Sequence, residues 1–216
     1  MIDALTLLRR RIETAGGDAH SVRIVAVTKG FGPDAVLAAR QAGLADVGEN
    51  YAQELVRKRR ELGPDAEDLR WHFLGTVQRN KVRALAPVVD CWQGLGRLVE
   101  GAEIARRRPA ACVFVEVDTT GAPNRGGCQP AEVPDLVAGL RELGLVVEGL
   151  MTVAPPRIDA ARQCFRAVRE LADDLGLIER SMGMSDDLEV AVAEGSTMVR
   201  VGRALFGNRP TRSVIA

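Results

Sequence analysis

The chain has 216 residues, of which 46% are hydrophobic and 27% are charged. This length can bury one sizeable core but is short for two typical domains, so we expect a single domain over residues 1–216. Lysine plus arginine and aspartate plus glutamate both number 29, which gives a formal net charge of zero. A balanced charge provides no global attraction to nucleic acid or to an anionic membrane, so partners must be recognised at a local site.

No segment has the pattern of a targeting signal or a membrane span. Residues 1–17 place their arginines after a short apolar stretch and include acidic residues, which is the wrong order for a secretory signal. Nowhere do about 18 apolar residues follow one another, as a membrane-spanning helix would need. We therefore expect a cytoplasmic protein that makes no membrane contact.

The cysteines and histidines argue against a metal centre. Four cysteines occur, without any Cys-x-x-Cys pair: Cys91, Cys112, Cys128 and Cys164. We expect them to be reduced and mostly buried, as free cysteines usually are. The two histidines, His20 and His72, are distant in sequence, which disfavours a histidine-built metal site or a Ser-His-Asp hydrolase. Lysine, serine, arginine and backbone amides remain as the groups that can carry chemistry.

Strand-like and helical segments alternate along the chain after a first helix over residues 1–15. Eight apolar segments read as strands, at residues 23–28, 44–49, 70–75, 88–93, 111–118, 146–153, 178–184 and 197–202. The segment 33–43 opens with proline and closes with glycine, the usual punctuation of a helix. Apolar residues spaced by three and four predict an amphipathic helix within 156–176. A further helix is expected from Ser185, as its N-cap, to Gly195.

This alternation predicts a parallel sheet with right-handed crossovers. Eight strand and helix units in a chain of this length favour a single (β/α)8 barrel of the TIM type, with an extra N-terminal helix. The alternative is an open sheet of five or six strands, because the segments 88–93 and 178–184 are weak strands by composition.

The predicted barrel brings polar residues to one mouth. Ligands of such barrels bind at the carboxyl ends of the strands, and phosphate groups commonly bind beside the loops after the seventh and eighth strands. The residues expected at that end are Lys29, Glu49, Asn50, Met151, Ser181, Arg200 and Gly202.

Lys29 follows directly on the apolar segment that ends at Thr28. Burial disfavours the charged ammonium, so the pKa of such a lysine falls, and the neutral amine can attack an aldehyde to form an imine. The alternative interpretations are a lysine that extends its ammonium to solvent or an ion pair with Glu49.

Two glycine-rich turns, "SMGMSDD" and "VRVGRALFG", each precede an expected helix and offer backbone N–H groups to a phosphate. The alternatives are that Ser185 only caps a helix, that Ser181 only packs, and that Gly202 only permits a tight turn. Arg200 lies between two valines, so its side chain points to the opposite side of the predicted strand from theirs. Its charge therefore needs water or a partner inside the mouth; the alternative is a surface salt bridge. A lysine, a phosphate cradle and an arginine match the aldehyde, phosphate and ring nitrogen of pyridoxal 5'-phosphate.

Five ordered motifs extend over most of the chain: "VAVTKG", "DVGENYAQEL", "WHFLGTVQRNKV", "GLMTVAP" and "SMGMSDDLEVAVAEGSTMVRVGRALFG". With these motifs the sequence resembles the pyridoxal phosphate homeostasis protein family. The resemblance implies a barrel like the N-terminal domain of alanine racemase, which holds pyridoxal 5'-phosphate as a Schiff base on Lys29. It also implies phosphate contacts from Ser181 and from the backbone of Gly202 and Arg203, with Arg200 at the pyridine nitrogen and Asn50 and Met151 near the cofactor.

Two positions depart from the family pattern. Arg203 stands where threonine is usual, so a hydroxyl contact to phosphate is lost while the backbone N–H remains. Its guanidinium either binds the phosphate or points into solvent. The segment "GTVQ", around Thr76, replaces the more usual "GHLQ" type.

The resemblance implies a protein that binds and buffers pyridoxal 5'-phosphate in vitamin B6 and amino-acid homeostasis, with apo-enzymes as candidate recipients and no catalytic residues. No heptad stripe in the sequence demands a dimer, so we expect a monomer. The alternative is an amino-acid racemase. Arginine at the ring nitrogen weakens the electron sink, and no second domain is expected after "ALFGNRP" to supply an opposing acid or base. The basic runs "RKRRE" and "RRRP" are expected to be solvated helix faces, not a nucleic-acid site.

Overall fold

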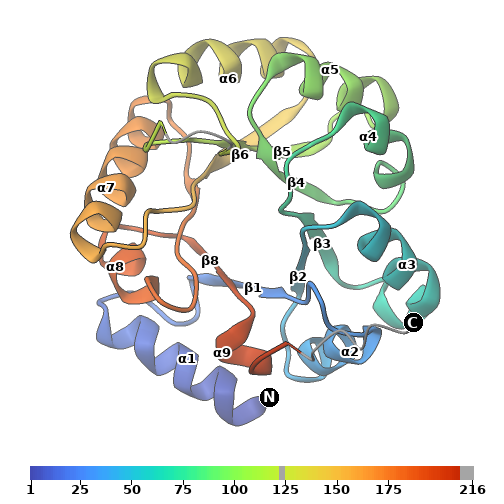
Figure 1. The fold of residues 1–216 in the computed structure, drawn as a ribbon, viewed down its shortest axis with the longest axis vertical. Helices are drawn as coiled ribbons and strands as arrows, with labels where there is room; N and C mark the ends of the chain where they lie inside the picture. Colours follow the sequence, from blue (N-terminus) through green and yellow to red (C-terminus); the bar gives the residue numbers. More distant parts are fainter. Residues whose placement is uncertain (122–124, 210–216) are drawn as a thin grey trace, which may run out of the picture.

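The eight strand-like segments form one closed parallel barrel. In a computed structural model, which describes residues 1–121 and 125–209, the strands pair in sequence order and β8 pairs with β1 to close the ring (Figure 1). The strands are β1 Arg23–Val27, β2 Asp46–Glu49, β3 Arg70–Phe73, β4 Cys91–Leu95, β5 Cys112–Glu116, β6 Val146–Met151, β7 Glu179–Ser181 and β8 Met198–Val201. The predicted (β/α)8 barrel is confirmed, and the open-sheet alternative is wrong.

Helices surround the barrel as an outer ring (Figure 1). The α-helices among the described residues are α1 Ile2–Thr14, α2 Pro33–Gln41, α3 Ala52–Leu62, α4 Arg79–Leu85, α5 Leu98–Arg107, α6 Val133–Glu142, α7 Ile158–Asp174, α8 Leu188–Ala193 and α9 Arg203–Phe206. Short 3-10 helices occur at η1 Gly63–Ala66 and η2 Pro130–Glu132. The expected N-terminal helix α1 packs beside α8 and α9. Within the described residues, none of these helices combines the length and apolar character needed to cross a membrane.

The helix predicted to begin after Ser185 begins later. Helix α8 starts at Leu188, and residues 185–187 form a turn in front of it. The Asp187 carboxylate accepts the backbone N–H of Met184 at 2.6 Å, which closes this turn. Ser185 is therefore not the N-cap of α8; its hydroxyl accepts the N–H of Ala204 at 3.3 Å.

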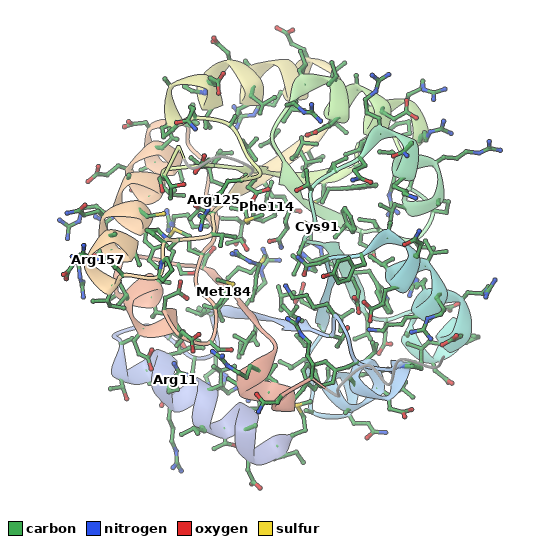
Figure 2. The ribbon with its side chains drawn as sticks, viewed as in Figure 1. Arg11, Cys91, Phe114, Arg125, Arg157 and Met184 are labelled. Carbon is green, nitrogen blue, oxygen red and sulfur yellow. The ribbon has the colours of Figure 1, made fainter. Side chains whose placement is uncertain are left out.

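Two apolar cores hold the fold. The larger one fills the space between the strands and the helices, where burial of apolar surface is the main stabilising contribution. The smaller one lies inside the barrel and consists of Val25, Cys91, Phe114, Met151 and Met198. Figure 2 shows Cys91 and Phe114 inside the ring of strands, whereas Arg157 lies on the outside.

Candidate functional site

A cavity of about 520 Å³ opens among the residues that follow the strands. Its volume lies within the range of roughly 300 to 1,000 Å³ that is typical of small-molecule sites. Six of the seven predicted site residues line it: Lys29, Asn50, Met151, Arg200, Gly202 and Arg203. The seventh, Ser181, is wholly buried and is absent from the lining. The fold thus gathers residues from β1, β2, β6 and β8 around one cavity.

The residues on both sides of Lys29 are anchored to helix α3. Lys58 of α3 donates through Nζ to the Thr28 carbonyl at 2.7 Å. Glu54, one turn earlier in the same helix, accepts the Gly30 N–H at 2.9 Å. Gly30 has a φ of +80°, a left-handed conformation that glycine adopts without the steric cost of a side chain. These contacts fix the loop, so Lys29 is presented from a rigid base.

The carboxylate of Glu49 pairs with Lys58 and not with Lys29. Lys58 Nζ lies 2.6 Å from Glu49 Oε1, which also accepts the Thr28 hydroxyl at 2.6 Å. Burial raises the pKa of Glu49, and the Lys58 charge opposes this rise. The alternative that Lys29 is the ion-pair partner of Glu49 is wrong. Within the "RKRRE" run, which was expected to be a solvated helix face, Arg57, Arg60 and Glu61 are exposed but Lys58 is wholly buried.

Lys29 itself is half-buried and has no hydrogen-bond or ion-pair partner among the described residues. Burial lowers its pKa, and the positive charges of Arg209 and Arg200 lower it further, against the opposing effect of Glu49. This is the direction that the sequence predicts. A larger share of the amine is therefore neutral and nucleophilic near pH 7 than in an exposed lysine.

Arg200 is buried on β8 with its guanidinium between β7 and the end of β6. Its Nη1 donates to the carbonyl and the hydroxyl of Ser181, and its Nη2 donates to the Thr152 carbonyl at 2.7 Å. Burial lowers the pKa of Arg200 to about 10, against the attraction of Glu116, so the side chain remains protonated at neutral pH. Three bonds hold the guanidinium, and two of its five N–H donors have no partner among the described residues.

A polar chain continues from Arg200 through the barrel interior. The Ser181 hydroxyl donates to Gln93 Oε1 at 2.7 Å, and Gln93 Nε2 donates to His72 Nδ1 at 2.8 Å. His72 Nε2 then donates to Asp46 Oδ1 at 2.7 Å. Burial lowers the pKa of His72, against the Asp46 carboxylate, and a neutral imidazole satisfies both contacts. The chain runs from Ser181, the last residue of β7, to Asp46, the first residue of β2, so it supports Arg200 from the barrel interior.

The turn after β8 offers backbone donors to the cavity. The N–H groups of Gly202 and Arg203 have no hydrogen-bond partner among the described residues. The Arg203 side chain is exposed and pairs with Asp186 across the cavity mouth. Its guanidinium is therefore neither directed only at solvent nor free for an anion.

Three residues at or beside this site were not predicted from the sequence: Arg209, Leu74 and Glu116. Arg209 lies beyond α9 and follows no strand, so no pattern pointed to it. Leu74 lines the cavity and lies two residues after His72. Because residues i and i+2 of a strand face the same side, this spacing could have indicated that Leu74 faces the barrel interior. Burial raises the pKa of Glu116 to about 7, with Arg200 opposing the rise. Glu116 ends β5, and its carboxyl group acts on the charge of Arg200, which no sequence pattern indicated.

Comparison with known proteins decides the family. The family model for the alanine racemase N-terminal domain matches residues 4–210. A pyridoxal phosphate homeostasis protein of Pseudomonas aeruginosa is 40% identical over 211 residues, which are 94% of this chain and 91% of that protein. The chain belongs to the pyridoxal phosphate homeostasis protein family. Another member, from Escherichia coli K12, is 36% identical and aligns over 95% of each chain.

Solved structures agree with membership of the pyridoxal phosphate homeostasis protein family. PipY of Synechococcus elongatus, solved with PLP bound, has a TM-score of 0.80 and 31% identity, covering 93% of this chain and all of PipY. An alanine racemase of Clostridium difficile 630 has a TM-score of 0.75 at 17% identity and covers 99% of this chain but 58% of the racemase. The second likeness concerns the fold alone.

Proposed function

We propose that this protein binds pyridoxal 5'-phosphate in the cavity, attached to Lys29, and holds it without turning over a substrate. The observation that carries the proposal is the unpaired, half-buried amine of Lys29 in a cavity that also presents the buried guanidinium of Arg200. A relative of the same family and fold, PipY, has been solved with PLP bound.

The polar groups left unpaired in the cavity fit this cofactor. Asn50 Oδ1 is buried without a hydrogen-bond partner among the described residues. The lining includes four positively charged side chains, Lys29, Arg200, Arg203 and Arg209, against the one carboxylate of Asp186. An excess of positive charge suits a phosphate dianion. An amine, an amide, a guanidinium and backbone donors are the groups that an aldehyde, a hydroxyl, a ring nitrogen and a phosphate require.

Each residue then has a definite task. When bound, the cofactor supplies an aldehyde that condenses with a primary amine and releases water. Lys29 provides that amine, and its lowered pKa supplies the neutral form. Arg200 donates an N–H to the ring nitrogen and, being unable to release its own proton near pH 7, leaves that nitrogen unprotonated. The backbone of Gly202 and Arg203 binds the phosphate, and Met151 packs against the ring.

The cavity favours holding over turnover. Racemisation needs an acid or base on each face of the substrate. Among the described lining residues there is no histidine, cysteine or tyrosine, and the one carboxylate, of Asp186, is paired with Arg203. An unprotonated ring nitrogen also weakens the electron sink that such chemistry uses. We include in the proposal that the protein is a cytoplasmic monomer and that it passes its cofactor to apo-enzymes that depend on it.

Binding and turnover can be tested on one preparation. Purified protein is titrated with pyridoxal 5'-phosphate, followed by its absorption and by dialysis, and the loaded protein is then incubated with L-alanine and analysed on a chiral column. We expect saturation at one equivalent per chain and no enantiomer exchange beyond that of free cofactor. Absence of saturable binding would refute the cofactor assignment, and exchange well above the free-cofactor rate would refute the assignment as a carrier.

A further inference from the structure

Two cysteines that are 21 residues apart in sequence meet at the end of the barrel opposite the cavity. Cys91 is the first residue of β4 and Cys112 the first residue of β5, and the two are direct partners in the strand register. Their sulfur atoms lie 3.2 Å apart. The sequence, which lacks any Cys-x-x-Cys pair, gave no sign of this contact.

The two sulfurs differ in their surroundings. Cys91 is wholly buried inside the barrel (Figure 2), whereas Cys112 is half-buried. Arg70 Nη2 lies 3.0 Å from Cys112 Sγ and also contacts both carboxylate oxygens of Glu148, at 2.8 and 2.9 Å. Arg70 and Glu148 line a surface pocket of about 420 Å³, so solvent reaches the groups that cover Cys112.

A metal site is the less favoured use of these groups. The ligand atoms of Cys91, Cys112 and Glu148 all lie within 4.8 Å of one another, which is compatible with a bound ion. However, the guanidinium of Arg70 already donates to one of the sulfurs and to the carboxylate. A cation would have to displace this fixed positive charge, whereas a sulfur that gains negative charge is stabilised by it.

We propose that Cys112 and Cys91 form an oxidation site in which a hydroperoxide converts the two thiols into an intramolecular disulfide. In the first step the Cys112 sulfur attacks the peroxide, the O–O bond breaks, and hydrogen peroxide yields a sulfenic acid and one water. In the second step the Cys91 sulfur attacks Cys112, the S–O bond breaks, and a second water leaves with the Cys91 proton. Two thiols are oxidised and one peroxide is reduced.

The order of the two steps follows from the geometry. Cys112 is the less buried of the two cysteines, and its sulfur lies 3.0 Å from the Arg70 guanidinium, which stabilises the negative charge that develops during the attack on the peroxide. Burial and the neighbouring Cys112 raise the pKa of Cys91, so it remains a thiol until it reacts. Neighbouring strands lie roughly 4.7 to 4.9 Å apart, which is within the spacing of roughly 4.4 to 6.8 Å that a disulfide accepts between Cα atoms.

The chain is well suited to mapping this disulfide. Trypsin separates the four cysteines onto the peptides 84–97, 108–125, 126–141 and 163–166. The reduced protein is treated with one equivalent of hydrogen peroxide, the remaining thiols are alkylated, and the digest is analysed by mass spectrometry without reduction. We expect a linked pair of peptides 84–97 and 108–125 that is two hydrogens lighter than their sum and that separates on reduction.

Matched variants assign the two roles. Cys128→Ser and Cys164→Ser change the other buried cysteines and should leave the yield of the linked pair unchanged. Cys91→Ser should leave a sulfenic acid on Cys112 that dimedone traps, whereas Cys112→Ser should leave no adduct on Cys91. Arg70→Met should slow formation of the linked pair several-fold, whereas Arg106→Met, on an exposed helix face, should leave the rate unchanged.

The wild-type digest decides the proposal without depending on any variant. If Cys91 and Cys112 are recovered as separately alkylated peptides from oxidised, folded protein, the proposal is wrong. Linkage to Cys128 or Cys164, or between two chains, would equally overturn it. In urea the same treatment should give mixed pairs, which shows that the fold selects the partner. The site is at the far end from the cavity, so its outcome is independent of cofactor binding.

Discussion

The hydroxyl of Ser181 accepts a hydrogen bond from Nη1 of Arg200 at 2.8 Å and donates one to Oε1 of Gln93 at 2.7 Å. Both contacts lie inside the barrel, below the cavity. We therefore expect Ser181 to act on a ligand through Arg200, whereas the resemblance to the family implied a direct contact with phosphate.

Replacing Ser181 separates these two roles. Ser181→Ala removes one bond to the Arg200 guanidinium, so we expect affinity to fall about five- to tenfold, equivalent to about 1 kcal/mol. The loss should be equal for pyridoxal 5'-phosphate and for pyridoxal, which lacks the phosphate. Dissociation constants for both ligands provide the measurement. A loss confined to the phosphorylated ligand would place the hydroxyl on the phosphate, and Gln93→Met should reproduce the effect of Ser181→Ala.

Arg203 should contribute little to affinity despite its place in the cavity wall. Its side chain is exposed and paired with Asp186, and exposed ion pairs contribute roughly 0 to 1 kcal/mol. We expect Arg203→Thr to change the dissociation constant of pyridoxal 5'-phosphate by about twofold or less. Asp186→Asn releases the guanidinium and should tighten binding in a salt-dependent manner. A tenfold loss in Arg203→Thr would show that the arginine binds the phosphate.

The lowered pKa of Lys29 should appear in the pH dependence of covalent attachment. The neutral amine is the nucleophile, so the rate rises with pH and levels off once the lysine is deprotonated. Because burial, then Arg209 and Arg200, lower its pKa, the midpoint should lie below the ordinary value of 10.5. Stopped-flow absorption between pH 6 and 10 measures the profile. Arg209→Gln should move the midpoint upward, and an unchanged profile would contradict the role assigned to that charge.

Glu116 should make the fold less stable as pH rises. Burial raises its pKa from 4.5 to about 7, so its contribution is fully present below pH 4.5 and is lost as pH rises through 7. Glu116→Gln remains neutral and should therefore be more stable than the wild type above pH 7, by on the order of 3 kcal/mol, and equally stable near pH 4.5. Urea unfolding at several pH values measures the difference. A difference that does not vary with pH would contradict the assigned pKa.

Much of the fold could be predicted from the sequence, because the spacing of apolar residues and the proline and glycine residues at helix ends are local features. All eight strand-like segments became strands, including the weak segments 88–93 and 178–184, since closure of the barrel stabilises strands whose own composition is poor. The start of α8 was misplaced because the Asp187 carboxylate closes a turn before it. Local propensity does not reveal which carboxylate takes a given N–H.

Site residues could be predicted where they directly follow or lie in a strand. They could not be predicted where contacts between distant segments determine the partner of a side chain. Lys29 and Arg200 were found from strand ends and parity. The partner of Glu49 was not, because Lys58 reaches it from the buried side of a helix whose basic run was expected to be solvated. Contacts between neighbouring strands, such as that of Cys91 with Cys112, depend on strand register, which the sequence alone does not determine.

The most direct test of the account is to identify the lysine that carries the cofactor. The protein is incubated with pyridoxal 5'-phosphate, reduced with borohydride and mapped by mass spectrometry. The chain has three lysines, Lys29, Lys58 and Lys81, of which Lys58 is buried in an ion pair and Lys81 lies on α4 outside the cavity lining. We predict a pyridoxyl group on Lys29 and none in Lys29→Ala. An adduct on Lys58 or Lys81, or no adduct at all, would contradict the central claim.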